Sequence, residues 1–266
     1  MDYTPAEQMV VCMAREIQNG DILAQGIATR MTISAAMLAK RTHAPNVYFA
    51  NSIGNSLTNR FTRVSLTGTE KDNLDMALSS FSFCHAVCEF LPRIKPKEFF
   101  RPAQIDSFGN TNNILIGTLH DIRLRLPGAA GIPDVSTYWK DAYLYVSHHS
   151  RKVFVPKVDF ISGIANGRGL KKVITNLAVF NFDGNGFHIE SIHDYTTLEE
   201  VIDCTGFPLT KDEPVPKTKA PTPEELRILR TEVDPNQLYN LEMLSGSERI
   251  EKLVTVIANE TKQNSK

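Results

Sequence analysis

The first fifty residues alternate between two hydrophobic patterns. The segments that these patterns predict are, in order, a helix from Pro5 to before Asn19, a strand over 21–28, a helix over 33–40 and a strand over 47–50. In the first helix, apolar side chains recur at helical spacing from Met9 to Ile17, and Thr4 forms a capping box with Glu7. The second strand is a short run of β-forming residues, which is typical of a buried strand. This alternation of helix and strand favours a layered α/β fold.

Similar patterns continue beyond residue 70, with one long interruption. The predicted elements are a helix over 72–78, strands over 81–87, 142–146, 158–161, 173–182 and 187–193, and helices over 198–204, over 222–231 and from 247 onward. The sequence Asp183-Gly184-Asn185-Gly186 predicts a hairpin turn between two of these strands. Between 99 and about 139, Gly, Asn, Pro and Asp replace the periodic runs, which is typical of functional or irregular loops.

A segment rich in proline and lysine marks the strongest change in composition. The predicted division is one α/β domain over 1–211, whose layered, mostly parallel sheet is flanked by helices, a linker over 212–223 and a helical extension over 224–266. The last helix places Ile250, Leu253, Val254 and Ile257 on one face. We therefore expect the extension to pack on the same domain or on a partner.

The composition is that of an ordinary globular protein. The chain has 266 residues, of which 42% are hydrophobic and 22% are charged, so intrinsic disorder is excluded. A net charge of -1 argues against nucleic-acid binding, and no apolar run approaches the ~18 residues of a membrane span. The first residues lack the basic and apolar blocks of a secretory signal, and four irregularly spaced cysteines indicate free thiols. We expect a cytoplasmic protein that binds neither nucleic acid nor membrane.

Polar residues follow directly after the strand over 47–50. Asn51, Ser52 and Gly54 stand at the carboxyl end of a strand that we expect to be parallel, where α/β proteins place ligands. Their polar groups can donate hydrogen bonds to a carbonyl oxygen or a developing oxyanion. A simple turn, in which Asn and Gly supply backbone freedom, explains the same residues. Both interpretations stay open for this loop.

Two further loops combine polar and small residues. The first contains Gln104, Asp106 and Asn110, whose polar groups need partners from turns, water or a ligand. The second contains Gly128 and Gly131, which allow backbone amides to approach a ligand closely. Neither loop fits a Walker loop or a Gly-x-Gly-x-x-Gly fingerprint.

Metal and nucleophile motifs are weak or absent from the sequence. His148 and His149 are adjacent, so on a strand their rings point to opposite faces and do not easily share a metal. Cys84 and Cys88 lack the second pair of a structural zinc site. The sequence contains no Gly-x-Ser-x-Gly elbow and no His-Glu-x-x-His motif. We therefore expect no metal site.

Short motifs recur in a recognisable order along nearly the whole chain. They are Ala44-Pro45, Ala103-Gln104-Ile105-Asp106, Gly109-Asn110, Gly128-Ala129-Ala130-Gly131, Arg151-Lys152, Val158-Asp159, Thr205-Gly206-Phe207 and Glu232-Val233-Asp234-Pro235. In this order they resemble the β subunit of the family I CoA-transferases, glutaconate CoA-transferase in particular. The resemblance implies an α/β subunit that pairs with a distinct α subunit in an α2β2 heterotetramer. It also implies an active site at their junction and no cofactor besides the coenzyme A of the substrate.

The same resemblance shows where this chain departs from the transferases. Their β subunit places a glutamate just after the third strand, and its carboxylate attacks the acyl-CoA to form a covalent intermediate. Here the corresponding stretch begins with Asn51, and no glutamate lies between Glu16 and Glu70. Because an amide cannot act as that nucleophile, the resemblance implies altered chemistry.

The C-terminal half is similar to a second branch, the β subunit of the ring-cleaving CoA hydrolases of steroid catabolism. The similar segments are Thr137-Tyr138-Trp139, 151–155, 158–164 and 173–182. Those enzymes also lack the β-subunit glutamate and use a carboxylate of the α subunit to hydrolyse a carbon–carbon bond. A third branch, which decarboxylates a glutaconyl-type CoA ester, has a cysteine at this position, and this chain has no cysteine near Asn51.

The resemblance thus implies an acyl-CoA hydrolase or ring-opening enzyme that is active only with its α subunit. The residues expected at the site are Asn51, Ser52, Gly54, Gln104, Asp106, Asn110, Gly128 and Gly131. Asn51 and Ser52 would orient the substrate or water, and the last two glycines would present backbone amides near the thioester. A conventional CoA-transferase, a decarboxylase and a non-catalytic subunit stay open as alternatives.

Overall fold

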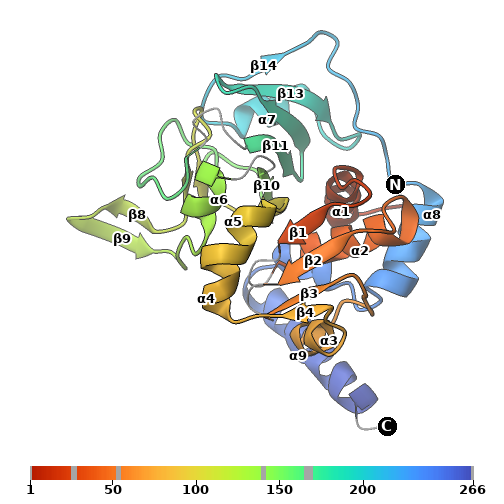
Figure 1. Ribbon diagram of the computed structural model, residues 1–266. Coiled ribbons are helices and arrows are strands. Elements are labelled where there is room, and N and C mark those ends of the chain that lie inside the picture. Colours follow the sequence, from red (N-terminus) through yellow and green to blue (C-terminus); the bar gives the residue numbers. More distant parts are fainter. Residues whose placement is uncertain (1, 25–28, 52–54, 139–141, 165–169, 265–266) are drawn as a thin grey trace. The chain divides into compact units, whose positions relative to one another are not determined.

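The computed structural model describes residues 2–24, 29–51, 55–138, 142–164 and 170–264 (Figure 1). The chain forms two compact units: unit 1 combines residues 1–96 with 221–266, and unit 2 comprises 97–220. These boundaries differ from the predicted division after residue 211, because the C-terminal segment packs with the N-terminal part of the chain. No helix among the described residues is long and apolar enough to cross a membrane.

The first part of unit 1 combines a mixed sheet with helices. Its elements are α1 (Pro5–Arg15), β1 (Ile22–Ala24), α2 (Arg30–Thr42), β2 (Tyr48–Asn51), β3 (Ser56–Thr58), α3 (Thr69–Asp75) and β4 (Ser79–Ser80). The strand order is β1-β2-β3-β4, in which β1 and β2 are parallel and the following pairs are antiparallel. The predicted helices α1 and α2, the strand β2 and the capping box of Thr4 with Glu7 are confirmed.

The segment after β4 is helical, so the prediction of a strand over 81–87 is wrong. It consists of α4 (Phe83–His85), a π-helical turn (Ala86–Phe90) and α5 (Leu91–Ile94). The hydroxyl of Ser82 caps the start because it accepts a hydrogen bond from the amide of His85 at 3.2 Å. The rings of Phe81 and Phe90 also pack, with centroids 4.9 Å apart. A short apolar run without clear periodicity is compatible with a strand or with a helix, and here the Ser82 cap at its start favours the helix.

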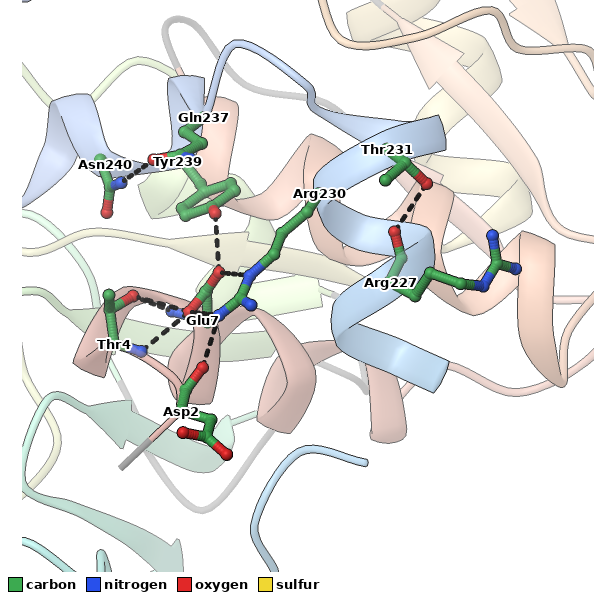
Figure 2. Close-up of polar contacts among 9 residues, drawn as sticks. All are labelled: Asp2, Thr4, Glu7, Arg227, Arg230, Thr231, Gln237, Tyr239 and Asn240. Atoms are coloured by element: carbon green, nitrogen blue, oxygen red, sulfur yellow. Dashed lines mark hydrogen bonds and ion pairs between the residues drawn. The ribbon is translucent and has the colours of Figure 1, made fainter. Parts of the chain in front are cut away.

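The C-terminal segment completes unit 1 through a buried polar network (Figure 2). It forms α8 (Pro223–Ile228), a π-helical turn (Leu229–Val233), a 3-10 helix (Leu238–Glu242) and α9 (Gly246–Asn264). Arg230 donates from Nε and Nη2 to the carboxylate of Glu7 at 2.7 and 2.9 Å, and the Tyr239 hydroxyl donates to it at 3.1 Å. Burial alone would raise the pKa of Glu7, but these bonds and one from the Thr4 amide hold that pKa below its usual value.

Two further buried carboxylates attach the C-terminal segment to the rest of unit 1. Glu242 accepts a hydrogen bond from the amide of Met31 at 2.8 Å and so caps the start of α2. Glu260 of α9 accepts hydrogen bonds from the amides of Leu66 and Thr67 at 2.8 and 3.1 Å. The large apolar side chains of α9 that remain exposed are Ile250, Val254 and Ile257. The helical extension therefore packs on unit 1 and leaves part of its predicted apolar face uncovered.

Unit 2 is built on a second mixed sheet. Its elements are β5 (Glu98–Phe100), β6 (Gln104–Ile105), β7 (Thr111–Asn112), β8 (Leu115–Thr118), β9 (Asp121–Arg125), α6 (Ile132–Tyr138), β10 (Ala142–Val146), β11 (Leu170–Thr175), β12 (Ala178–Phe182), β13 (Phe187–Ile192), α7 (Leu198–Asp203) and β14 (Thr210–Lys211). The main sheet has the order β14-β13-β12-β11-β10-β5, with β6–β7 and β8–β9 as separate hairpins. Strands β5, β10 and β11 run parallel and β13 pairs in parallel with β14, whereas β11–β12 and β12–β13 are antiparallel. The predicted α/β class is confirmed, and the antiparallel pairs occur where short turns join β11, β12 and β13.

Two predicted strands of unit 2 also need correction. The predicted strand over 173–182 is divided because the hydroxyl of Thr175 accepts hydrogen bonds from the amides of Leu177 and Ala178 at 3.1 and 3.0 Å, which closes a turn. The segment predicted as a strand over 158–161 is irregular. Its first amides donate to the side chains of the 101–113 loop instead of to a neighbouring strand.

The predicted linker over 212–223 is extended but bound to the sheet. The amide of Ile192 in β13 donates to the carbonyl of Pro216 at 3.0 Å, and the amide of Thr218 donates to the carbonyl of Ile192 at 2.8 Å. The segment therefore continues along the edge of the sheet instead of lying free in solvent.

Candidate active site

The loop over 101–113 is organised around one buried carboxylate. Oδ1 of Asp106 accepts hydrogen bonds from the amides of Phe108 and Asn110, both at 3.1 Å, and Oδ2 accepts one from the Asn110 side chain at 3.2 Å. Gly109 takes a left-handed backbone with φ +75°, which suits glycine in so tight a turn. Asp106 and Asn110 therefore hold the loop in its shape through contacts within the loop.

The side chain of Gln104 in β6 is buried, and its Oε1 atom accepts two hydrogen bonds. Its Oε1 accepts hydrogen bonds from the Asn112 side chain at 2.7 Å and from the amide of Asp159 at 3.0 Å. Gln104 therefore ties the loop to the segment that follows residue 157. The sequence analysis singled out Gln104 but not its partner Asn112.

In Thr111 of β7 the backbone amide and carbonyl are both hydrogen-bonded, whereas the side-chain hydroxyl has no partner in the described part of the chain. Its amide donates to the carbonyl of Gly163 at 2.9 Å, and its carbonyl accepts from the amide of Ser162 at 2.8 Å. The residue is 4% exposed, yet Oγ1 has no hydrogen-bond partner among the described residues. Because buried hydroxyls are nearly always hydrogen-bonded, this one is notable.

The side chain of Thr111 lines a mostly apolar pocket of unit 2. The residues around this Thr111 pocket include Phe100, Gly109, Ile132, Leu144 and Gly163. Gly109 belongs to the first polar loop of unit 2 and Ile132 directly follows the glycine-containing second loop, so the structure brings these two predicted loops together. A Cβ atom on Gly163 would lie 2.5 Å from Thr111 Oγ1 and 2.7 Å from Ile132 Cγ2. Glycine at 163 therefore keeps the space beside the hydroxyl open.

The glycine-containing loop uses one of its amides inside the protein. Gly128 has φ +119°, and its amide donates to the carbonyl of Asn113 at 2.9 Å. The expectation that this amide points to a thioester is therefore not met. Gly131 is exposed at the start of α6.

Asn51 ends β2 in unit 1 and is buried, with 1% exposure. It pairs in register with Ser56 of β3. Ser52 and Gly54 lie outside the described residues. The structure thus brings Gln104, Asp106 and Asn110 together in unit 2, and it places Asn51 in unit 1.

Comparison with known proteins bears directly on this pocket and its fold. A family profile described as Coenzyme A transferase matches residues 98–203, which include the lining of the Thr111 pocket. A 3-oxoadipate CoA-transferase subunit of Pseudomonas knackmussii is 28% identical over 257 residues, covering 86% of this chain and 92% of that protein. The cholesterol ring-cleaving hydrolase IpdB subunit of Mycobacterium tuberculosis is 26% identical over 255 residues, covering 91% of this chain and 99% of that protein. The crystal structure of the decarboxylase AibA/AibB matches with a TM-score of 0.80 at 26% identity, covering 90% of this chain and 98% of that chain.

Residues 98–203 therefore match the coenzyme A transferase family, and most of the chain is similar to proteins with three different names: a CoA-transferase, a ring-cleaving hydrolase and a decarboxylase. These similarities support the fold, and the reaction has to be argued from the residues.

Two buried titratable groups stand out in unit 2: Glu98, which no sequence pattern marks, and His149, which the sequence marks only as half of an adjacent histidine pair. Glu98 opens β5 and pairs in register with Ala142 of β10, and burial raises its pKa to about 8. His149 stacks on Phe154 with centroids 4.0 Å apart, and burial lowers its pKa to about 3, so the ring is neutral. Neither residue belongs to a motif that would reveal it. Over the described ranges, no three His, Cys, Asp or Glu side chains gather to hold a metal ion.

Proposed function

We propose that this chain is the β subunit of a heteromeric enzyme that acts on an acyl-CoA thioester. The observation that carries the proposal is the similarity to subunits of CoA-transferases and of a ring-cleaving hydrolase over 86–91% of the chain, within which residues 98–203 match the Coenzyme A transferase profile. The polar loop of Gln104, Asp106 and Asn110 lies inside that matched region. The 3-oxoadipate CoA-transferase and IpdB subunits are matched over 92% and 99% of their length, which supports the same role in a complex here.

Within that function we propose hydrolysis or carbon–carbon bond cleavage, including ring opening, in place of CoA transfer. Covalent transfer needs a carboxylate to attack the thioester, and Asn51 stands where the sequence resemblance places that glutamate. In the proposed reaction water adds to a carbonyl carbon, the adjacent carbon–carbon bond breaks, and the released carbon takes up a proton. Asn51 and Ser52 orient the substrate or the water, while a carboxylate of the partner acts as the base.

The remaining site residues have supporting roles in this proposal. Gln104, Asp106 and Asn110 hold the wall of the Thr111 pocket through the hydrogen bonds of their loop. We assign Gly54, three residues after Asn51 in the sequence, to substrate binding, and the exposed Gly131 presents its backbone to the thioester.

We also propose that a distinct α subunit completes the site in an α2β2 assembly. Uncovered apolar side chains support an interface on each unit. They are Ile250, Val254 and Ile257 on α9, and Leu119, Ile122 and Leu124 on the β8–β9 hairpin. Both elements are labelled in Figure 1. A two-stranded hairpin is only marginally stable by itself, so an apolar face on it favours a covering partner. The names AibA/AibB and IpdAB of two similar structures each denote two components, which agrees with this proposal.

A conventional CoA-transferase is the second candidate. The similarity to the 3-oxoadipate CoA-transferase of Pseudomonas knackmussii favours it. Because Asn51 cannot form an acyl anhydride, transfer would need a carboxylate from the partner.

Reconstitution tests the proposed function. The chain is co-expressed with a candidate α subunit, and the complex is incubated with linear and cyclic 3-ketoacyl-CoA thioesters. We expect the complex, and neither subunit alone, to consume at least one thioester without an added carboxylate acceptor. Turnover that depends on an acceptor such as acetate would establish transfer instead. A fully active ~30 kDa monomer would overturn the subunit role.

A further inference from the structure

The last helix, α9, has few buried contacts with the rest of unit 1. Among its described side chains, Val256 and Glu260 are buried, at 2% and 5% exposure, whereas most of the others are exposed. A single buried valine gives a helix of 19 residues little hydrophobic anchoring. Segments with so few buried apolar contacts are the ones that open locally while the rest of a protein stays folded. The attachment of α9 therefore depends largely on Glu260.

The carboxylate of Glu260 is bound by the turn over 65–67. Its Oε2 accepts hydrogen bonds from the hydroxyls of Ser65 and Thr67 at 3.0 and 2.8 Å and from the Thr67 amide at 3.1 Å, and Oε1 accepts one from the Leu66 amide at 2.8 Å. Burial alone would raise the pKa of Glu260, but these bonds hold that pKa below its usual value, so the group is charged at neutral pH. Because hydrogen bonds to an ionised acceptor are the stronger kind, this one side chain supplies most of the attachment.

A glycine lies at the other end of α9. Gly246, the first residue of the helix, is exposed and has a left-handed backbone with φ +56°, and a Cβ atom there would meet nothing within 4 Å. Glycine adopts other backbone angles at no steric cost, and hinges are a few terminal residues that absorb such a change. Glu242, four residues earlier, is buried and caps α2, so the firmly held part of the chain ends just before Gly246.

We propose that α9 is a hinged helix that Glu260 holds closed on the 65–67 turn, and that it opens at Gly246 as a local unit while the rest of unit 1 stays folded. The closed state keeps the exposed side chains of Ile250, Val254 and Ile257 in fixed positions, and the open state does not. The hydrogen bonds of Glu260 therefore regulate any contact that is made through this face of α9. The inference goes beyond the proposed function, because it concerns the chain alone and involves no substrate.

Hydrogen exchange of the full chain tests local opening in the wild type. The amides of Leu66 and Thr67 report on it directly because each donates to Glu260. We expect these amides and those of α9 to exchange well before the amides of α1 and α2, most of whose residues are buried. Exchange of α9 only together with α1 and α2 would show that the helix opens by global unfolding, and would overturn the inference.

Two substitutions on α9 provide a matched comparison. In Glu260→Gln the side chain loses its charge, and an amino group replaces one of the two oxygens that accept from the turn. We expect the Leu66, Thr67 and α9 amides to exchange about 10- to 100-fold faster, as the loss of one hydrogen bond to a charged group allows, with no change in α1 and α2. Glu251→Gln removes a carboxylate from an exposed position of the same helix and should leave all of these rates unchanged. Wild-type rates in Glu260→Gln, an equal effect of both substitutions, or unfolding of the whole chain by Glu260→Gln overturns the inference.

Discussion

Replacement of Gly163 by alanine perturbs the Thr111 pocket without adding charge or polarity. The new Cβ would lie 2.5 Å from Thr111 Oγ1 and 2.7 Å from Ile132 Cγ2, whereas ordinary van der Waals contact begins at 3.4 Å. The backbone of residue 163 is tied to Thr111 by hydrogen bonds in both directions, so it cannot easily withdraw. The neighbouring side chains therefore have to move by about an ångström.

The size of the effect follows from that overlap. Overpacking of a buried site costs about 1–3 kcal/mol. For a chain of this length each kcal/mol lowers Tm by about 2–4 °C, so we expect Gly163→Ala to unfold about 2–12 °C below the wild type. The overlap is with buried side chains of unit 2, so the cost falls on folding stability.

Differential scanning fluorimetry measures the change in Tm, and a second glycine serves as the control. A Cβ on Gly186, in the turn between β12 and β13, would meet nothing within 4 Å. Gly186→Ala should change stability by less than about 0.5 kcal/mol. If Gly163→Ala matches this control in Tm, the geometry assigned to Gly163 and Thr111 is wrong.

Three further predictions concern buried polar residues. Asn51→Ala should reduce turnover of the complex less than Asn51→Glu, because a new carboxylate repels a developing oxyanion; wild-type kinetics in both variants would place Asn51 outside the site. Glu7→Gln should cost only about 1–2 kcal/mol, because Arg230 is 39% exposed. Since the pKa of Glu7 lies below 4.5 in the folded state, urea unfolding should show this cost above pH 4.5 and lose it as the pH falls through the folded pKa. Glu98→Gln should become increasingly stabilising as the pH rises from 4.5 to about 8, because the raised pKa of Glu98 makes folding of the wild type bind a proton there; parallel stability curves would contradict this.

Local signals in the sequence predict much of the fold. The capping boxes begun by Thr4 and Thr222 locate the starts of α1 and α8, and both are present in the structure. The Asp-Gly-Asn-Gly turn between β12 and β13 is equally local. Two predicted strands are wrong for different reasons. The run over 81–87 is helical because the side chain of Ser82 caps its start. The segment over 158–161 is irregular because its amides form hydrogen bonds with the distant 101–113 loop. Periodicity carries no information about such contacts.

The candidate site shows the same limit in physical terms. A local excess of polar residues marks the loop of Asp106 and Asn110, and the structure shows that these groups largely satisfy one another. Thr111 and Gly163 lie side by side in unit 2, yet they are far apart in sequence and neither belongs to a motif. Only the fold, which bonds their backbones together, reveals that one hydroxyl is left over among the described residues.

The central claim is that this chain and its partner cleave an acyl-CoA with water and form no covalent intermediate on this chain. Turnover of a 3-ketoacyl-CoA by the complex in ¹⁸O-labelled water, followed by mass spectrometry of the product and of the intact chain, tests it most directly. The account predicts ¹⁸O in the product and an unmodified chain, even after borohydride is added during turnover. An unlabelled product accompanied by a coenzyme A adduct on this chain would contradict it.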